Sequence, residues 1–136
     1  MNDSNLVKTC LVVLALAALT VGLPAAFAPA SFYEDYPFLT SWVNLLPPYN
    51  EHLITDVGGL YVGFGFLFCW SLAKPSRQLI LPLCIAWLIS QVLHLAFHIS
   101  HLEGFTTTDA IGQTLGFVIL LVAAMIPIAI LWNRRN

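Results

Sequence analysis

Charged residues are scarce in this sequence. Lys, Arg, Asp and Glu together make up 9% of the 136 residues, whereas hydrophobic residues make up 59%. A typical soluble domain has about 25% charged residues, so an ordinary soluble protein is excluded. The chain also has no basic patch for nucleic acid, no glycine-rich phosphate loop and no signature of a nucleophilic serine. The composition indicates a single integral membrane domain in the lipid bilayer.

Cysteine is also rare, with only Cys10, Cys69 and Cys84. All three fall within apolar segments, so no structural disulfide is expected in the exposed loops. Two roles stay open for them. They pack as small buried hydrophobic side chains, which we expect, or they act as soft ligands of a metal.

Long apolar runs are what the sequence has in abundance. Four of them can each cross about 30 Å of hydrocarbon as a helix. They are residues 6–23, 53–72, 79–99 and 110–132. All five basic residues fall on the same side of these spans: Lys8, Lys74, Arg77, Arg134 and Arg135. By the positive-inside rule, the sequence predicts an all-α, four-helix bundle in a bacterial inner membrane, with both termini cytoplasmic.

The connections between the spans differ greatly in length. Outer loops are expected at residues 24–52 and 102–109, and a short inner loop at 73–78. In the long outer loop, Ser31 and Glu34 have the spacing of a capping box, which predicts a short helix. Tyrosine and tryptophan in this loop are typical of a membrane interface. We therefore expect one or more short helices lying on the outer leaflet.

The first span also has the features of a secretory signal peptide. Lys8 precedes an apolar stretch that ends in Ala-Phe-Ala at 26–28. Cleavage after this motif would place Pro29 first in the mature chain, which is unfavourable. We interpret the segment as a retained first helix with a packing role.

Three of the four histidines lie in the third span or just after it, at positions 94, 98 and 101. At 100° per residue, His94, His98 and His101 fall within about 60° on one helix face, and Trp87 and Gln91 lie on the same face. Ionisable side chains at membrane depth are costly, so they usually face a bundle interior or a cavity and mark a functional site. This polar stripe is the first candidate site.

A second polar group opens the second span. It consists of Glu51, His52 and Asp56, and the last two share a helix face with Gly59 and Gly63. The Gly-x-x-x-Gly spacing predicts close approach of a neighbouring helix. Because a short loop joins the second and third spans, we expect an antiparallel hairpin that places this group opposite the histidines.

The fourth span and the loop before it add polar residues at the same level. These are Glu103, Asp109 and Gln113. Either Thr108 or Asp109 is expected to cap the fourth helix. Gly112 and Gly116 repeat the close-packing spacing.

Imidazole nitrogens combined with carboxylate oxygens suit Zn, Fe or Cu. The sequence therefore predicts a transition-metal site that opens toward the outer face and supports redox or metal-handling chemistry. The candidate ligands are His94, His98, His101, His52, Asp56 and Glu51. The residues expected to orient them or to line the pocket are Gln91, Trp87, Glu103, Asp109 and Gln113.

Other interpretations of the same residues stay open. A His/Asp packing network would fit a non-catalytic subunit that assembles with a membrane partner or with further copies of the chain. Proton-coupled transport would need a polar path through the inner half, where ionisable groups are few. A quinone would use Trp87 as a pocket wall and a histidine as proton partner. Haem is disfavoured because the three histidines share one helix face.

Three motifs carry a resemblance to a known group of proteins. They are Ser-Phe-Tyr-Glu-Asp-Tyr-Pro at 31–37, Pro-Tyr-Asn-Glu-His-Leu at 48–53 and Asp-Val-Gly-Gly-Leu-Tyr at 56–61. The chain resembles small four-span bacterial membrane proteins that are distantly similar in layout to DoxX-like proteins. Such relatives often have Arg before the aspartate, where this chain has Thr55. The resemblance implies a four-helix membrane bundle and carries no activity with it.

Overall fold

The structure, a computed structural model, describes residues 3–37, 42–46 and 48–133. This part of the chain is helical and contains no strand. The long helices are α1 (Asp3–Phe27), α3 (Glu51–Ala73), α4 (Arg77–Ile99) and α5 (Thr107–Asn133). Each is long and apolar enough to cross a membrane. The predicted all-α fold with four membrane helices is confirmed, and each helix extends beyond its predicted span at one end or both.

Two short helices lie in the first long loop, α2 (Pro29–Asp35) and the 3-10 helix η1 (Val43–Leu45). The prediction of a short helix in this loop is therefore confirmed. The predicted capping box is wrong, because α2 already begins at Pro29 and has no side-chain cap. Proline suits this position, where a backbone N–H would lack an intrahelical partner. Ser31 and Glu34 consequently lie inside the helix.

The capping residue of α5 lies before both of the predicted positions. The hydroxyl of Thr106 accepts a hydrogen bond from the backbone N–H of Asp109 at 3.2 Å and donates one to Asp109 Oδ2 at 2.6 Å. Thr106 is therefore the capping residue, and the expectation of Thr108 or Asp109 is wrong. At the start of α3, the side chain of Asn50 accepts a hydrogen bond from the backbone N–H of Leu53 at 3.0 Å.

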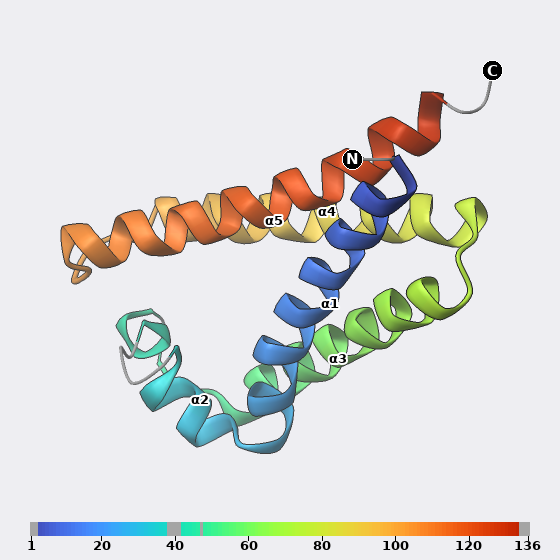
Figure 1. Cartoon of the computed structure of the whole chain (residues 1–136). Helices are drawn as coiled ribbons and strands as arrows, with labels where there is room; N and C mark the ends of the chain where they lie inside the picture. The colour runs from blue at the N-terminus through green and yellow to red at the C-terminus, as the bar shows by residue number, and fades with distance from the viewer. Residues whose placement is uncertain (1–2, 38–41, 47, 134–136) are drawn as a thin grey trace.

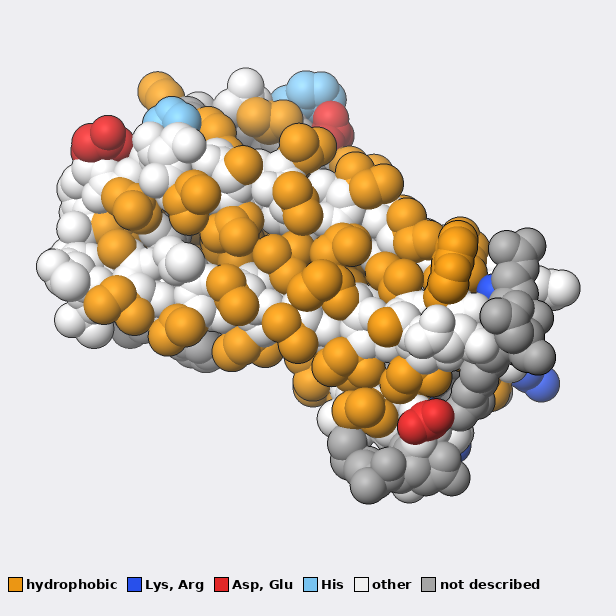
Figure 2. Space-filling model, turned by 90° about the horizontal axis from the view of Figure 1, so that it is seen from above, with side chains coloured by type: hydrophobic (Ala, Val, Ile, Leu, Met, Phe, Trp, Pro, Cys, Tyr) orange, Lys and Arg blue, Asp and Glu red, His pale blue; other side chains and the backbone are white. Residues whose placement is uncertain are grey.

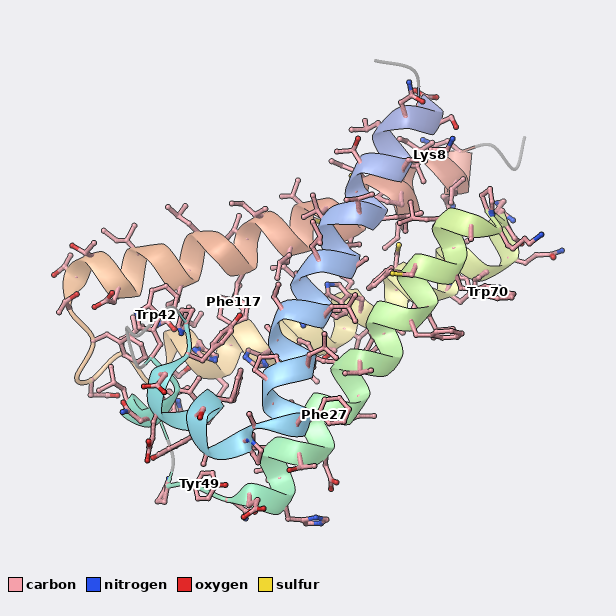
Figure 3. The ribbon with its side chains drawn as sticks, turned by 60° about the horizontal axis from the view of Figure 1, so that its bottom comes forward. Lys8, Phe27, Trp42, Tyr49, Trp70 and Phe117 are labelled. Carbon is pink, nitrogen blue, oxygen red and sulfur yellow. The ribbon has the colours of Figure 1, made fainter. Side chains whose placement is uncertain are left out.

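The long helices form two antiparallel pairs. α4 and α5 lie side by side, and α1 packs along α3 while also contacting α5 (Figure 1). A short loop joins α3 to α4, as predicted, but the two helices diverge away from that loop (Figures 1 and 3). The backbone of α3 therefore has α1, and not α4, as its main neighbour.

Small residues allow the close approach of α1 and α3. A Cβ atom added to Gly22 of α1 would lie 2.7 Å from the backbone nitrogen of Val62, and one added to Gly58 would collide with the backbone of Ala25 and Ala26. A Cβ atom added to Gly65 would likewise collide with the side chain of Leu19. Close packing of a neighbouring helix is thus a property of Gly22, Gly58 and Gly65.

The glycines that were predicted to mediate close packing do not do so. A Cβ on Gly59, Gly63 or Gly116 would meet no atom of the described residues within 4 Å. A Cβ added to Gly112 would lie 3.5 Å from the indole of Trp42 and, among the described residues, would meet no neighbouring long helix within 4 Å. The prediction is wrong because α3 turns the Gly58 and Gly65 face toward α1, which leaves Gly59 and Gly63 on the outside.

Trp87 of α4 forms the centre of the core and is fully buried. Three aromatic rings of α3 surround its indole edge to face, with centroid distances of 5.5 Å for Tyr61, 5.3 Å for Phe64 and 5.4 Å for Phe68. Beside them, Gln91 Nε2 donates a hydrogen bond to Tyr61 Oη at 2.9 Å. Side chains, and not close backbones, therefore hold α3 to α4.

The surface between the two ends of the molecule is apolar. Many large hydrophobic side chains of the four long helices are exposed, as expected for helices that face lipid. Figure 2 shows this hydrophobic surface with histidines toward one end and Lys or Arg toward the other. We call these the histidine end, defined by His94, His98 and His101, and the basic end, defined by Lys8, Lys74 and Arg77. Arg134 and Arg135 lie outside the described residues.

The cysteines are free thiols. Cys10 and Cys84 are buried, in agreement with the expected packing role, whereas Cys69 is exposed on α3. The expectation of burial is therefore wrong for Cys69, because its face of α3 has no neighbouring helix.

Candidate functional site at the histidine end

The polar stripe of α4 runs from the buried core to the surface. Trp87 and Gln91 are buried at 0% and 1% exposure, His94 and His98 are partly buried, and His101 is exposed. The expectation that the stripe faces the bundle interior is confirmed for its deeper part. The candidate site therefore consists of His94 and His98, which lie between the closed core and the surface.

His94 and His98 form a stacked pair one helical turn apart. Their ring centroids are 4.6 Å apart and their planes differ by 14°. Phe117 of α5 packs against both rings, at 5.0 Å from His94 and 4.8 Å from His98. The two imidazoles are therefore held nearly parallel between helices α4 and α5.

Gln113 of α5 fixes the orientation of His98. The distance from His98 Nδ1 to Gln113 Oε1 is 2.9 Å, and Gln113 is only 4% exposed. Because an amide oxygen only accepts hydrogen bonds, this amide orientation places the proton of His98 on Nδ1. The Nε2 atom then carries a lone pair that can bind a metal or accept a proton.

Two polar groups of the site have no protein partner in the part of the chain that the structure describes. Gln113 Nε2 is buried without a hydrogen bond. His94 makes ring contacts with His98 and Phe117 but no hydrogen bond with a described residue. An unpaired buried donor costs about 1–3 kcal/mol, so Gln113 Nε2 favours a bound hydrogen-bond acceptor at this place.

His101 has a different environment from the other two histidines. Its Nδ1 donates to the carbonyl oxygen of Phe97 at 2.8 Å, and its ring stacks on Phe97 at 4.1 Å. His101 therefore satisfies a carbonyl at the end of α4. Because this contact occupies Nδ1 of His101, that nitrogen cannot take part in a site at His94 and His98.

The second predicted group lies apart from the histidines of α4. His52 Nε2 is 3.3 Å from Asp56 Oδ2, with 88% and 60% of the two side chains exposed. The predicted pairing on one face of α3 is thus present. Its predicted place opposite His94 and His98 is not, because α3 follows α1 and diverges from α4 (Figure 3). Glu51 is also exposed, in the first turn of α3.

The remaining predicted residues do not complete a metal-binding cluster. Glu103 is exposed in the loop before α5, and Asp109 is engaged by Thr106 and Trp42. Among the residues that the structure describes, no three His, Cys, Asp or Glu side chains group together as metal ligands. The tertiary structure therefore offers a pair of histidines with a glutamine where the sequence predicted a larger ligand set.

Trp42 is a residue of this end that sequence reasoning did not assign to the site. Its indole Nε1 donates to Asp109 Oδ1 at 3.0 Å, and its ring lies against Gly112. Figure 3 shows Trp42 and Phe117 at the same end of the molecule, away from Lys8. No local pattern links positions 42 and 109, whereas Phe117 could have been found from its i, i+4 spacing to Gln113.

The hydrogen bond from Trp42 to Asp109 predicts that this indole helps to hold the first loop against α5. We expect Trp42→Phe to lower the free energy of unfolding by about 1 kcal/mol, because the hydrogen bond to Asp109 is lost. Amide hydrogen exchange of Val43–Leu46 should become faster, while exchange in α3 stays unchanged. Unchanged protection of this loop would contradict the assigned role of Trp42.

Comparison with family models, curated proteins and solved structures finds no match to this chain. Function therefore has to follow from the geometry of the site.

Proposed function

We propose that this multi-pass membrane protein binds a transition metal at its histidine end through His94 and His98. The observation that supports this most directly is the stacked imidazole pair whose second member is oriented by Gln113. Metal-binding histidines commonly donate their other ring N–H to an oxygen acceptor, which fixes the tautomer. The His98 to Gln113 bond has this form.

The proposed site has two protein nitrogens and leaves further coordination positions to water or substrate. Zinc binds histidine at about 2.0–2.1 Å, so the two Nε2 atoms must turn toward one point when metal enters. Both residues are on one helix, and the movement falls mainly to the side chain of His94, since Gln113 holds that of His98. An open coordination position would suit redox or metal-handling chemistry with zinc, iron or copper.

The orientation in the membrane is part of the same proposal. The basic end would face the cytoplasm of a bacterium by the positive-inside rule, with both termini on that side. The histidine end would then receive its metal from the outer side of the inner membrane.

Elemental analysis and cobalt(II) titration of the purified full chain test this proposal. We expect about one metal per chain or per dimer, and loss of binding by at least tenfold in His94→Ala and His98→Ala, because each removes one of two protein ligands. His52→Ala is the matched control and should bind normally, since His52 is exposed and remote. Absence of stoichiometric metal, or equal metal in the double variant, would contradict the proposal.

A second candidate is a structural subunit of a membrane complex. This role is favoured by two hydrogen bonds between different helices, Gln91 to Tyr61 and His98 to Gln113. This role predicts that Gln113→Leu lowers stability by about 1 kcal/mol whether or not metal is present. Under the metal proposal, added metal should raise the melting temperature of the wild-type chain more than that of the variant.

A further inference from the structure

A pocket of about 300 Å³ lies at the basic end, opposite the histidines. It is formed where the start of α1, the end of α3, the start of α4 and the end of α5 meet. Its polar lining consists of Ser4, Lys8, Ser71, Ser76 and Arg77. The pocket is therefore shared by all four long helices and is separate from the proposed metal site.

The charge of this pocket is positive. Lys8 comes from α1 and Arg77 from α4, and among the described residues no Asp or Glu lines the pocket. Arg77 Nε donates to the carbonyl oxygen of Leu131 at 2.8 Å, which holds the guanidinium at the pocket wall. Two cations from different helices, of which Arg77 is held in place, favour an anion between them, and a guanidinium matches the geometry of phosphate oxygens.

A buried hydroxyl supplies an independent indication of a ligand. Ser71 is 0% exposed and lines the pocket, yet its Oγ has no hydrogen-bond partner among the described residues. Such a group is costly unless a ligand or water satisfies it. α4 also begins here, and its capping residue Ser76 makes no side-chain cap, so the positive end of this helix adds to the field.

The rest of the lining is apolar and indicates what kind of molecule the anionic group belongs to. Val7, Leu11, Leu72, Ile80 and Leu131 form hydrophobic walls next to the charged groups. A ligand that matches both parts has an anionic head and a hydrocarbon chain. Lipids of one leaflet offer both, at the depth where membrane helices end.

We propose that this pocket binds the phosphate group of an anionic phospholipid. Lys8 and Arg77 contact the phosphate oxygens, Ser71 donates its hydroxyl to one of them, and the hydrophobic walls receive the start of an acyl chain. The lipid then joins α1, α3, α4 and α5 at the end where the Lys and Arg residues of the described part gather.

Native mass spectrometry of the detergent-solubilised chain tests this with phosphatidylglycerol and phosphatidylcholine. We expect phosphatidylglycerol to bind about tenfold more tightly, because its headgroup lacks a compensating cation. Lys8→Gln and Ser71→Ala should each reduce this binding several-fold. Lys74→Gln is the matched control, since Lys74 lies at the same end but outside the pocket lining, and it should bind like the wild-type chain.

The variants also separate binding from folding. Ser71→Ala removes a hydroxyl that has no protein partner, so its melting temperature without lipid should not fall. Equal binding of the two lipids, or an equal loss in Lys8→Gln and Lys74→Gln, would overturn the proposal. Inorganic phosphate that binds with the same dependence on Lys8 and Ser71 would assign the pocket to a soluble phosphate and overturn the lipid source.

Discussion

Replacing Gly58 by alanine is expected to lower the free energy of unfolding by about 1–3 kcal/mol, although alanine is the better helix former. The added methyl group would collide with the backbone of Ala25 and Ala26, which cannot turn aside as a side chain can. α1 and α3 would have to separate, and the contact that allows their close approach at Gly22 would loosen as well.

Gly59→Ala is the matched control for this substitution. Gly59 is the next residue on the same helix, and a methyl group there meets no described atom within 4 Å. The gain in helix propensity is at most about 1 kcal/mol, so stability should stay equal or rise slightly. Thermal unfolding in one detergent, followed by circular dichroism, compares the two. A larger loss for Gly59→Ala than for Gly58→Ala would contradict the assigned packing of α3.

Truncation of Trp87 to alanine is expected to cost more, about 3–5 kcal/mol. The indole is fully buried and contacts Tyr61, Phe64 and Phe68 edge to face. These contacts are the principal side-chain connection between α3 and α4, whose backbones diverge. The three surrounding rings would lose their dispersion contacts with the indole. Neighbouring side chains would fill the resulting cavity only in part.

Trp70→Ala supplies the comparison. Trp70 is 51% exposed on α3 and stacks loosely on Phe66, with centroids 6.1 Å apart. Its loss should cost less than about 1 kcal/mol, since most of the indole has no protein neighbour. Circular dichroism is the suitable measurement because both substitutions remove a fluorophore. Equal destabilisation by the two variants would show that Trp87 is not the centre of the core.

The two proposed binding sites can be tested separately because they lie at opposite ends of the molecule. His94 and His98 are far along α4 from Arg77, with the closed core at Trp87 and Gln91 between them. Substitution of a histidine should therefore leave lipid binding intact, and substitution of Lys8 should leave metal binding intact. Failure of one proposal does not imply failure of the other.

The sequence by itself determined the four apolar helices, the separation of the basic residues from the histidines, and the polar stripe of α4. These follow from local properties. The length of an apolar run decides whether it can cross a bilayer, and the 100° step decides which residues share a helix face. For the same reason, the pairing of His52 with Asp56 could be predicted from their spacing.

Only the tertiary structure decided which helix each face meets. In a soluble protein an apolar face points to the core, but lipid chains are as apolar as leucine, so hydrophobicity does not distinguish a face toward lipid from one toward another helix. The sequence therefore could not separate Gly58 from Gly59. It also could not show that α3 packs along α1. This packing separates His52 and Asp56 from the histidines of α4 and leaves His94, His98 and Gln113 as the candidate site.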